Sequence, residues 1–536
     1  MVNIDSFFKK PSLTDWNEQT KKILKIEDDE KLETCLNKNS LEGISYRPLY
    51  TKSESTIHLN TFPEFRSYWR EVIKTNGANK DESGGISTFL TELPIVAPKS
   101  TKIIQNIRSK NYTIFGDELL LDLVSLFESF DLDLDKLKSE VIKVNKKNNC
   151  NFFIDTRRIH NAGGSVVQEI VTALSFGKYA MEELGAESSK IYFGFAQDSK
   201  FFLNISKLRS FRYIWETVLE NENTSTNNFS IIGFNSYREQ TIYDPWMNML
   251  RNNVSASASF LGGADIIVAT AFDSLRDDLS DTQISELGFR QSRNMLHILG
   301  EESNLDKVLD PGKGSYTIEN LSTSFVEESY ELFKKYEKSG GLLNNYQSFS
   351  DLVKEISLKR LQEVRKRKLI LSGINDFCNT DESVSIKTKR IENKKENSTF
   401  FPKVRIAQDF ECLRLRVENS KLPKKMLLAT FGDASKLSPR IMFAKNYFGI
   451  LGVDVDIKHL TGSNFDFTNE EYLAFVFCAQ DEDYLRFMET FIPQIPKKKC
   501  VFIASKNVEI DGAQNIFMGQ NVYSILNEFV NQELQS

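Results

Sequence analysis

Short apolar runs alternate with helix-length amphipathic segments over residues 41–375. The runs at 152–154, 191–195 and 266–269 contain almost no polar residue, which is typical of parallel strands that are buried on both faces. Helical segments lie between and after them, such as 165–184, in which apolar residues recur on one face. The alternation predicts a parallel sheet covered by helices, and its length favours a closed (β/α)8 barrel over an open sheet.

A second strand–helix alternation fills residues 424–536. Five short strands with helices between them, in about 110 residues, are typical of a doubly wound, flavodoxin-like domain. The expected strands are 426–430, 453–457, 473–479, 500–505 and 516–518.

The two remaining stretches are polar. Residues 379–423 include a charge-rich segment at 387–397, whose lysines and arginine suggest an anion-binding patch. The interleaved glutamates favour a solvated linker instead. Residues 1–40 hold one short amphipathic helix, expected within 16–35. We therefore predict four parts: an N-terminal arm at 1–40, a barrel at 41–378, a linker at 379–423 and a flavodoxin-like domain at 424–536.

Composition narrows the class of protein. Apolar residues make up 40% and charged residues 26% of the 536 residues, which excludes wholesale disorder. The net charge of −6 gives no global electrostatic footprint for nucleic acid. The six cysteines form no C-x-x-C pair, and the apolar runs are too short to span a membrane. Since the first ten residues also lack the apolar core of a signal peptide, we expect a soluble, cytoplasmic protein.

Few residues point to chemistry by position alone. The four histidines limit any multi-histidine metal site. His160 follows a predicted strand, where barrel enzymes carry catalytic groups. Asp155 and Asp273 hold similar places, where capping of the next helix is the ordinary role of a carboxylate. Residues 310–315 resemble a phosphate loop superficially, but the spacing is that of a turn. These positions do not define an activity.

Several longer blocks resemble the adenosylcobalamin-dependent methylmalonyl-CoA mutases. Asp155-Thr156-Arg157-Arg158-Ile159-His160-Asn161-Ala162-Gly163-Gly164 is similar to the third-strand region of that family. Further similar blocks are 168–170, 243–251, 262–265, 290–294, 301–303 and 310–316 with Glu319. They follow the family order over most of residues 41–375, and the order of barrel, linker and flavodoxin-like domain matches as well.

The C-terminal domain departs from the family pattern. Catalytic mutase subunits carry a D-x-H-x-x-G motif after the first strand of this domain, and its histidine is the lower axial ligand of cobalt. Counting back without gaps from Gly452 places this motif on residues 435–440, with Leu437 at the ligand position. Pro439 and Arg440 stand where a glycine admits the cofactor's tail. Residues 477–480 and 504–509 also lack the later segments that contact this tail.

The barrel departs as well. Catalytic subunits have a Tyr-His pair before the Ala-Gly of the third-strand motif, and its histidine contacts the thioester carbonyl of the substrate. Aligning Ala162-Gly163 places Arg157-Arg158 at this pair, with Arg158 at the histidine. His160 falls two places later and is not the counterpart. The segment that reads CoA looks eroded at 45–50 and 62–66. The resemblance therefore points to the small, non-catalytic subunit of the bacterial heterodimeric enzyme.

The resemblance implies an assembly whose chemistry lies elsewhere. A large subunit would bind adenosylcobalamin and interconvert (R)-methylmalonyl-CoA and succinyl-CoA by radical rearrangement, while this chain would have no catalytic, cofactor-binding or metal-binding residues. The arm at 1–40 would wrap the partner. The 40 phenylalanines are compatible with a filled barrel axis, and the sequence alone leaves both a filled and an open axis possible. Two alternatives stay open: a subunit of a related acyl-CoA mutase with an atypical cofactor mode, or an interaction scaffold without a mutase partner.

Overall fold

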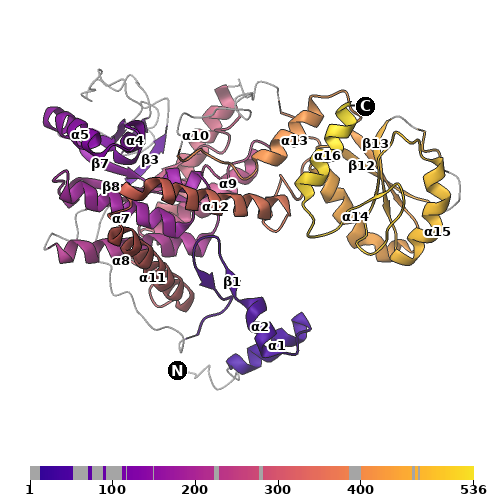
Figure 1. Ribbon diagram of the computed structural model, residues 1–536, viewed down its shortest axis with the longest axis horizontal. Coiled ribbons are helices and arrows are strands. Elements are labelled where there is room, and N and C mark those ends of the chain that lie inside the picture. Colours follow the sequence, from indigo (N-terminus) through magenta and orange to yellow (C-terminus); the bar gives the residue numbers. More distant parts are fainter. Residues whose placement is uncertain are drawn as a thin grey trace.

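The computed structural model describes most of the chain. The described residues are 12–51, 70–74, 88–91, 112–115, 118–148, 150–222, 229–276, 282–384, 400–460, 465–468 and 471–535. The apolar alternation at 41–375 and the one at 424–536 produce two separate sheets, each with helices packed against it (Figure 1). The predicted α/β class with parallel sheets is confirmed.

The first sheet closes on itself in the order β10-β3-β4-β5-β6-β7-β8-β9. Its strands are β3 (Arg70–Lys74), β4 (Thr88–Thr91), β5 (Tyr112–Phe115), β6 (Glu118–Asp122), β7 (Asn151–Asp155), β8 (Ile191–Gln197), β9 (Ser230–Asn235) and β10 (Ile266–Ala269). β6 to β10 pair in parallel, and β10 closes the barrel by pairing in parallel with β3.

One strand departs from the uniformly parallel barrel that the sequence predicts. β5 runs antiparallel to both β4 and β6. Only two residues separate β5 from β6, and a connection this short joins antiparallel strands, because a parallel crossover needs about a dozen residues or more.

Helices follow the later strands of the barrel and cover its outside. They are α4 (Leu123–Ser129), α5 (Leu134–Asn148), α6 (Arg157–Asn161), α7 (Val166–Glu182), α8 (Phe201–Asn221), α9 (Pro245–Leu261), α10 (Thr282–His297), α11 (Tyr316–Lys338) and α12 (Tyr346–Arg365). α7 begins where the sequence places it, because the side chains of Ser165 and Gln168 form a reciprocal capping box. The turn at 310–315 is fixed by Asp310, which forms a buried ion pair with Arg209 of α8.

The second sheet has five parallel strands in the order β12-β11-β13-β14-β15. Its elements are β11 (Lys425–Thr430), α14 (Ala434–Gly449), β12 (Asp454–His459), β13 (Tyr472–Cys478), α15 (Asp481–Phe491), β14 (Val501–Ile503), β15 (Gln514–Asn515) and α16 (Val522–Gln535). Helix α13 (Gln408–Glu418) lies within the stretch interpreted as a linker, and Arg416 donates to Asn527 of α16 at 2.7 Å.

The N-terminal residues form a projection. Helices α1 (Leu13–Leu24) and α2 (Asp29–Leu36) are followed by the short strands β1 (Lys38–Asn39) and β2 (Ser45–Tyr46), which pair antiparallel. Figure 1 shows α1 and α2 standing away from the barrel, joined to it through β1. Helix α1 buries none of its residues, and α2 buries only Leu32. Among all described helices, none is long and apolar enough to cross a membrane.

Candidate functional site

The barrel axis is packed with side chains on the strands whose side chains the structure describes. The interior residues alternate along β6 to β10 with residues of the outer core, as expected for a closed barrel. They are Leu120, Phe153, Tyr192, Ile232, Phe234, Ile266 and Val268. The ring of Phe153 lies directly over Gly194. A Cβ added at Gly194 would come within 2.7 Å of this ring, so only glycine leaves room for it. This packing agrees with the filled axis that the phenylalanine content makes possible.

Arg157 caps this interior at the carboxyl ends of the strands. Its guanidinium binds Asp155 through two hydrogen bonds of 2.6 Å and lies 3.7 Å from the centre of the Phe234 ring. Asp155 also accepts a hydrogen bond from the Arg157 backbone amide at 3.1 Å. Burial and the neighbouring Asp155 raise the pKa of Asp122, which holds the matching place on β6. The mouth where barrel enzymes bind substrates is thus occupied here by an internal ion pair.

Arg158 points away from the barrel axis. Its guanidinium forms an ion pair with Glu128 of α4, and Tyr346 of α12 donates to the same carboxylate at 3.1 Å. The acidic partners raise the pKa of the Arg158 guanidinium, so the residue stays charged. In this position the side chain joins α4, α6 and α12, and contributes no group to the axis.

His160 is enclosed among charged groups. Its Nδ1 lies 2.7 Å from Glu169 Oε1, and its Nε2 lies 2.7 Å from Ser236 Oγ. Burial, with Arg238 and Lys207 nearby, lowers the pKa of His160 to about 3 although Glu169 opposes the shift. The ring is 2% exposed, so this serine–histidine–glutamate set has no access for a substrate. Its neutral imidazole acts as a hydrogen-bonding bridge between α6, α7 and the loop after β9.

Asp273, the other strand-end carboxylate, lies against α10. A Cβ added at Gly288 would come within 2.1 Å of its Oδ1, so glycine is needed for this approach. Burial raises the pKa of Asp273.

The position of the expected cobalt ligand lies inside a helix in the C-terminal unit. Leu437 belongs to the first turn of α14 and is completely buried. Its side chain has no lone pair to donate to a metal. Pro439 follows within the same helix, which leaves residues 435–440 as regular helix rather than as an open ligand loop.

Beside β11, helix α14 is bound to the segments that follow β13 and β14. Arg440 of α14 binds Asp481 at 2.8 Å and donates to the carbonyl of Ala479 at 2.5 Å. Asp481 accepts further hydrogen bonds from Ser505 at 2.9 Å and Asn507 at 3.1 Å. Ligands of doubly wound sheets bind outside the carboxyl ends of the strands, at the point where the strand order reverses. These hydrogen bonds join α14 to the segments after β13 and β14, which border that point.

His459 is the single histidine in the sequence of this unit. It ends the edge strand β12, is exposed, and has its Nδ1 3.1 Å from Thr430 Oγ1 at the end of β11. Among the described residues, no group of three or more His, Cys, Asp or Glu side chains is arranged to hold a metal ion.

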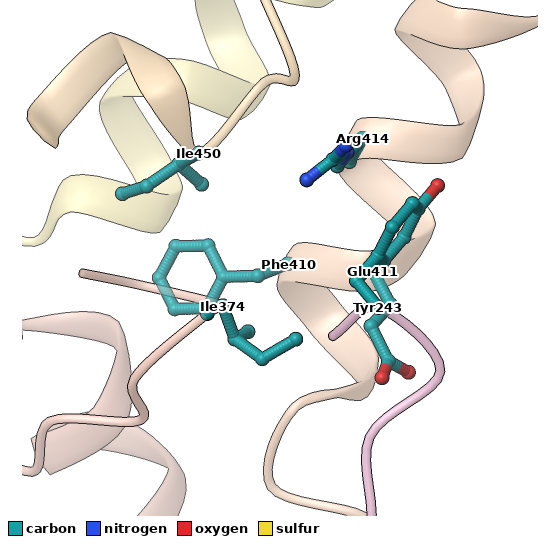
Figure 2. Close-up of a pocket in the computed structure, with 7 residues that line it drawn as sticks. Tyr243, Ile374, Phe410, Glu411, Arg414 and Ile450 are labelled. Carbon is teal, nitrogen blue, oxygen red and sulfur yellow. The ribbon is translucent and has the colours of Figure 1, made fainter. Parts of the chain in front are cut away.

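The barrel and the C-terminal unit meet at a small pocket (Figure 2). It is lined by Tyr243, Gly373, Ile374, Phe410, Glu411, Arg414 and Ile450. Arg414 of α13 lies 4.0 Å from the centre of the Tyr243 ring and binds Glu418 at 2.8 Å. Tyr243 donates its hydroxyl to Glu418 at 2.8 Å. Glu411 accepts from the backbone amide of Ile242 at 2.7 Å. These polar groups bind each other across the junction and hold α13 against the loop after β9.

A buried charge cluster near the same end of the barrel carried no recognisable signal in the sequence. Glu42, Arg238 and Arg360 are each at most 2% exposed and lie on three segments distant in sequence. Only Gly43, next to Glu42, hints at a close backbone approach.

A family model described as methylmalonyl-CoA mutase matches residues 136–434, which is more than half of the chain. The chain belongs to the methylmalonyl-CoA mutase family.

The chain is similar to small subunits of this mutase family. It is 26% identical over 408 residues to the methylmalonyl-CoA mutase small subunit of Porphyromonas gingivalis, covering 70% of this chain and 65% of that protein. The small subunit of Streptomyces virginiae is 26% identical over 403 residues, covering 70% and 62%. The methylmalonyl-CoA mutase of Escherichia coli is 24% identical over 273 residues, covering 46% and 36%. The chain thus spans about one third to two thirds of the length of these relatives.

The residues of this mutase-family chain do not fit cobalamin bound in the family manner. The position at which the resemblance leads us to expect the cobalt ligand is a buried leucine within a helix, and Arg440 of the same helix is bound to Asp481. The position at which the resemblance leads us to expect the contact to the substrate carbonyl holds Arg158, which is bound to Glu128.

Proposed function

We propose that this chain is the small subunit of an adenosylcobalamin-dependent methylmalonyl-CoA mutase, an isomerase that interconverts (R)-methylmalonyl-CoA and succinyl-CoA. In this proposal the chain is non-catalytic and supports a large subunit. The packed barrel axis, capped by Arg157, is the observation that carries the non-catalytic role, because it leaves no room for CoA along the described strands. The relatives are named small subunits, and this supports the proposal that the chain has a large-subunit partner.

The two sheets are assigned to domains of the mutase family as part of this proposal. The closed barrel and the five-stranded sheet are proposed to be the (β/α)8 barrel and the flavodoxin-like, degenerate cobalamin-binding domain of the mutases, with the parts divided at 1–40, 41–378, 379–423 and 424–536. The strand order of the second sheet, with the first strand between the second and third, supports this assignment.

Adenosylcobalamin belongs to the large subunit in this proposal, since it supplies the radical chemistry there. The partner is a large mutase subunit in a cytoplasmic heterodimer, without nucleic acid or membrane. Exposed Leu13, Ile23 and Leu24 on α1 support the arm at 1–40 as a segment that the partner covers. When the partner covers these three side chains, they are expected to form part of an interface that buries more than about 2,000 Å² of surface in total.

Two other functions compete with this one. A subunit of a related acyl-CoA mutase with an atypical cofactor mode would need another cobalt ligand, and exposed His459 is the histidine that borders the appropriate sheet edge. An interaction scaffold without a mutase partner would keep the fold and lack a large subunit.

Co-expression with a large mutase subunit from the same genome tests the proposal. Turnover of methylmalonyl-CoA with adenosylcobalamin is measured for each chain alone and for the purified complex. We expect a stable 1:1 complex with activity, and no activity of this chain alone. Turnover by the isolated chain supports the atypical enzyme, and failure to form any complex supports the scaffold.

A further inference from the structure

The base of the N-terminal projection is fastened to the barrel by a buried carboxylate. Glu42 lies in the turn between β1 and β2 and is 1% exposed. Ile44 joins the outer core of the barrel, and Tyr46 packs against it. Because α1 buries nothing, these neighbouring residues carry the attachment of the projection.

The Glu42 carboxylate meets three cations and a backbone amide. Its Oε1 accepts from Lys200 Nζ at 2.5 Å and from the Arg360 guanidinium at 2.7 Å, with the Arg238 guanidinium 3.9 Å away. Its Oε2 accepts from the backbone amide of Val166 at 3.2 Å. Both carboxylate oxygens are therefore hydrogen-bonded within a water-poor site, where charge-assisted bonds are strong.

The amide belongs to the N-terminus of α7, a helix of 17 residues. Ser165 and Gln168 already satisfy each other's backbone amides in the capping box, which leaves Val166 as a first-turn donor. The helix dipole also favours negative charge at this end. The Glu42 carboxylate thus takes the place that an anion occupies at a helix N-terminus.

The two arginines are held by the barrel independently of Glu42. Arg360 donates to the carbonyls of Gly163 and Gly164, both at 3.3 Å. Arg238 donates to the Gly164 carbonyl at 2.9 Å and to Asp198 at 3.0 Å. These bonds position the guanidinium groups without the projection, so the site is preformed on the barrel.

The backbone of the projection fits closely over this site. Gly43 has φ +95°, and a Cβ added there would come within 2.7 Å of Val167 Cγ2. A side chain at this position would both strain the backbone and separate Glu42 from α7.

We propose that the barrel carries a carboxylate-binding site, formed by Lys200, Arg360 and the N-terminus of α7, and that Glu42 is its tethered ligand. The site takes small carboxylates as a class, and through Glu42 it fixes the position of the N-terminal projection. This inference concerns the isolated chain and does not depend on a mutase partner.

Chemical rescue of Glu42→Ala in the full chain tests the site. The substitution removes the ligand and leaves a space of carboxylate size. We expect the amide of Val166 to exchange hydrogen about tenfold faster or more than in the wild type, because it loses its bond to the Glu42 carboxylate. Sodium acetate should restore slow exchange and raise the Tm, whereas acetamide and sodium chloride at the same concentration should not. Equal effects of the three additives, or wild-type exchange in the variant, would overturn the proposal.

Two further variants complete the test. Glu42→Gln keeps the volume of the side chain and removes its charge. We expect the Val166 amide to exchange faster in this variant, and acetate should not reverse the change because the glutamine side chain still fills the site. If Glu42→Ala is insoluble in every additive, exchange in Glu42→Gln decides alone, and a wild-type rate there rejects the site. Glu33→Ala is the matched control, because Glu33 lies in the same projection and forms an exposed pair with Arg47 at 3.4 Å. Acetate should not affect it.

Discussion

The Arg157 guanidinium lies 3.7 Å from the centre of the Phe234 ring and closes the interior of the barrel. The same guanidinium forms a bidentate ion pair with the Asp155 carboxylate. A cation stacked on a ring and bound to a carboxylate is held rigidly at this mouth. Arg157 therefore covers the Phe234 ring at the carboxyl ends of the strands and ties it to β7 through Asp155.

We expect Arg157→Ala to lower the free energy of unfolding by about 3 kcal/mol, because Asp155 is left buried without its partner. Urea unfolding at pH 7 measures the change. The double variant Asp155→Asn, Arg157→Met removes both charges and should recover much of the loss. A double variant as unstable as Arg157→Ala would show that the ion pair is not the cause.

Arg158→His restores the residue type of catalytic mutases at that position. We expect no gain of turnover with adenosylcobalamin and methylmalonyl-CoA, because the side chain at 158 is directed to Glu128 and not to the axis. Stability should fall, since Glu128 loses a strong partner. Arg158→Lys, which keeps the charge, is the control. Detectable activity in Arg158→His would contradict the geometry.

The isolated chain is expected to leave the absorption spectrum of hydroxocobalamin unchanged. Leu437→His should not change this result, because position 437 is buried within α14. That variant should also lose stability by about 1–3 kcal/mol, the cost of burying an unpaired polar group. A spectral change in the wild type that disappears in His459→Ala would instead favour the atypical cofactor mode.

The buried His160 predicts a defined pH dependence. Its pKa of about 3 in the folded chain lies below the ordinary value of about 6.5, so the unfolded chain binds more protons between these values. The free energy of unfolding should therefore decrease as the pH falls from 6.5 toward 3, by up to about 1.4 kcal/mol per pH unit from this group. Urea unfolding at pH 7, 6 and 5 measures the slope.

His160→Gln should reduce that slope, whereas exposed His459→Gln should keep it. The groups facing His160 are Glu169, Ser236, Arg238 and Lys207. An unchanged slope in His160→Gln would show that His160 does not cause the pH dependence.

Leu13, Ile23 and Leu24 on α1 are expected to matter only for assembly. Replacing all three with serine should leave the Tm of the isolated chain unchanged, because they contact no core. The Kd for a large mutase subunit should rise by about tenfold or more, as for loss of apolar contacts at an interface. Leu358→Ser with Met518→Ser is the control, since both residues are also exposed. Equal affinities of all variants would remove α1 from the interface.

The sequence by itself determined many of the elements and the family, although it predicted one N-terminal helix in place of α1 and α2 and placed the last strand at 516–518 rather than 514–515. Local signals were sufficient for this: the capping box at Ser165 places the start of α7, and the apolar runs at 191–195 and 266–269 become β8 and β10. The blocks from 155 to 319 indicate the mutase family because they depend on residue identity, which the sequence states directly. The direction of β5 was missed, although the two-residue connection to β6 determines it.

Only the tertiary structure decided what the substituted residues do. The sequence shows arginines at 157 and 158, but neighbouring residues point in different directions, and only the fold directs one to Phe234 and the other to Glu128. Glu42 gave no signal, because its cations stand 158 and 318 residues away along the chain. Charged residues so distant in sequence come into contact only when the barrel closes. In the closed barrel Glu42 is buried and bound to Lys200 and Arg360.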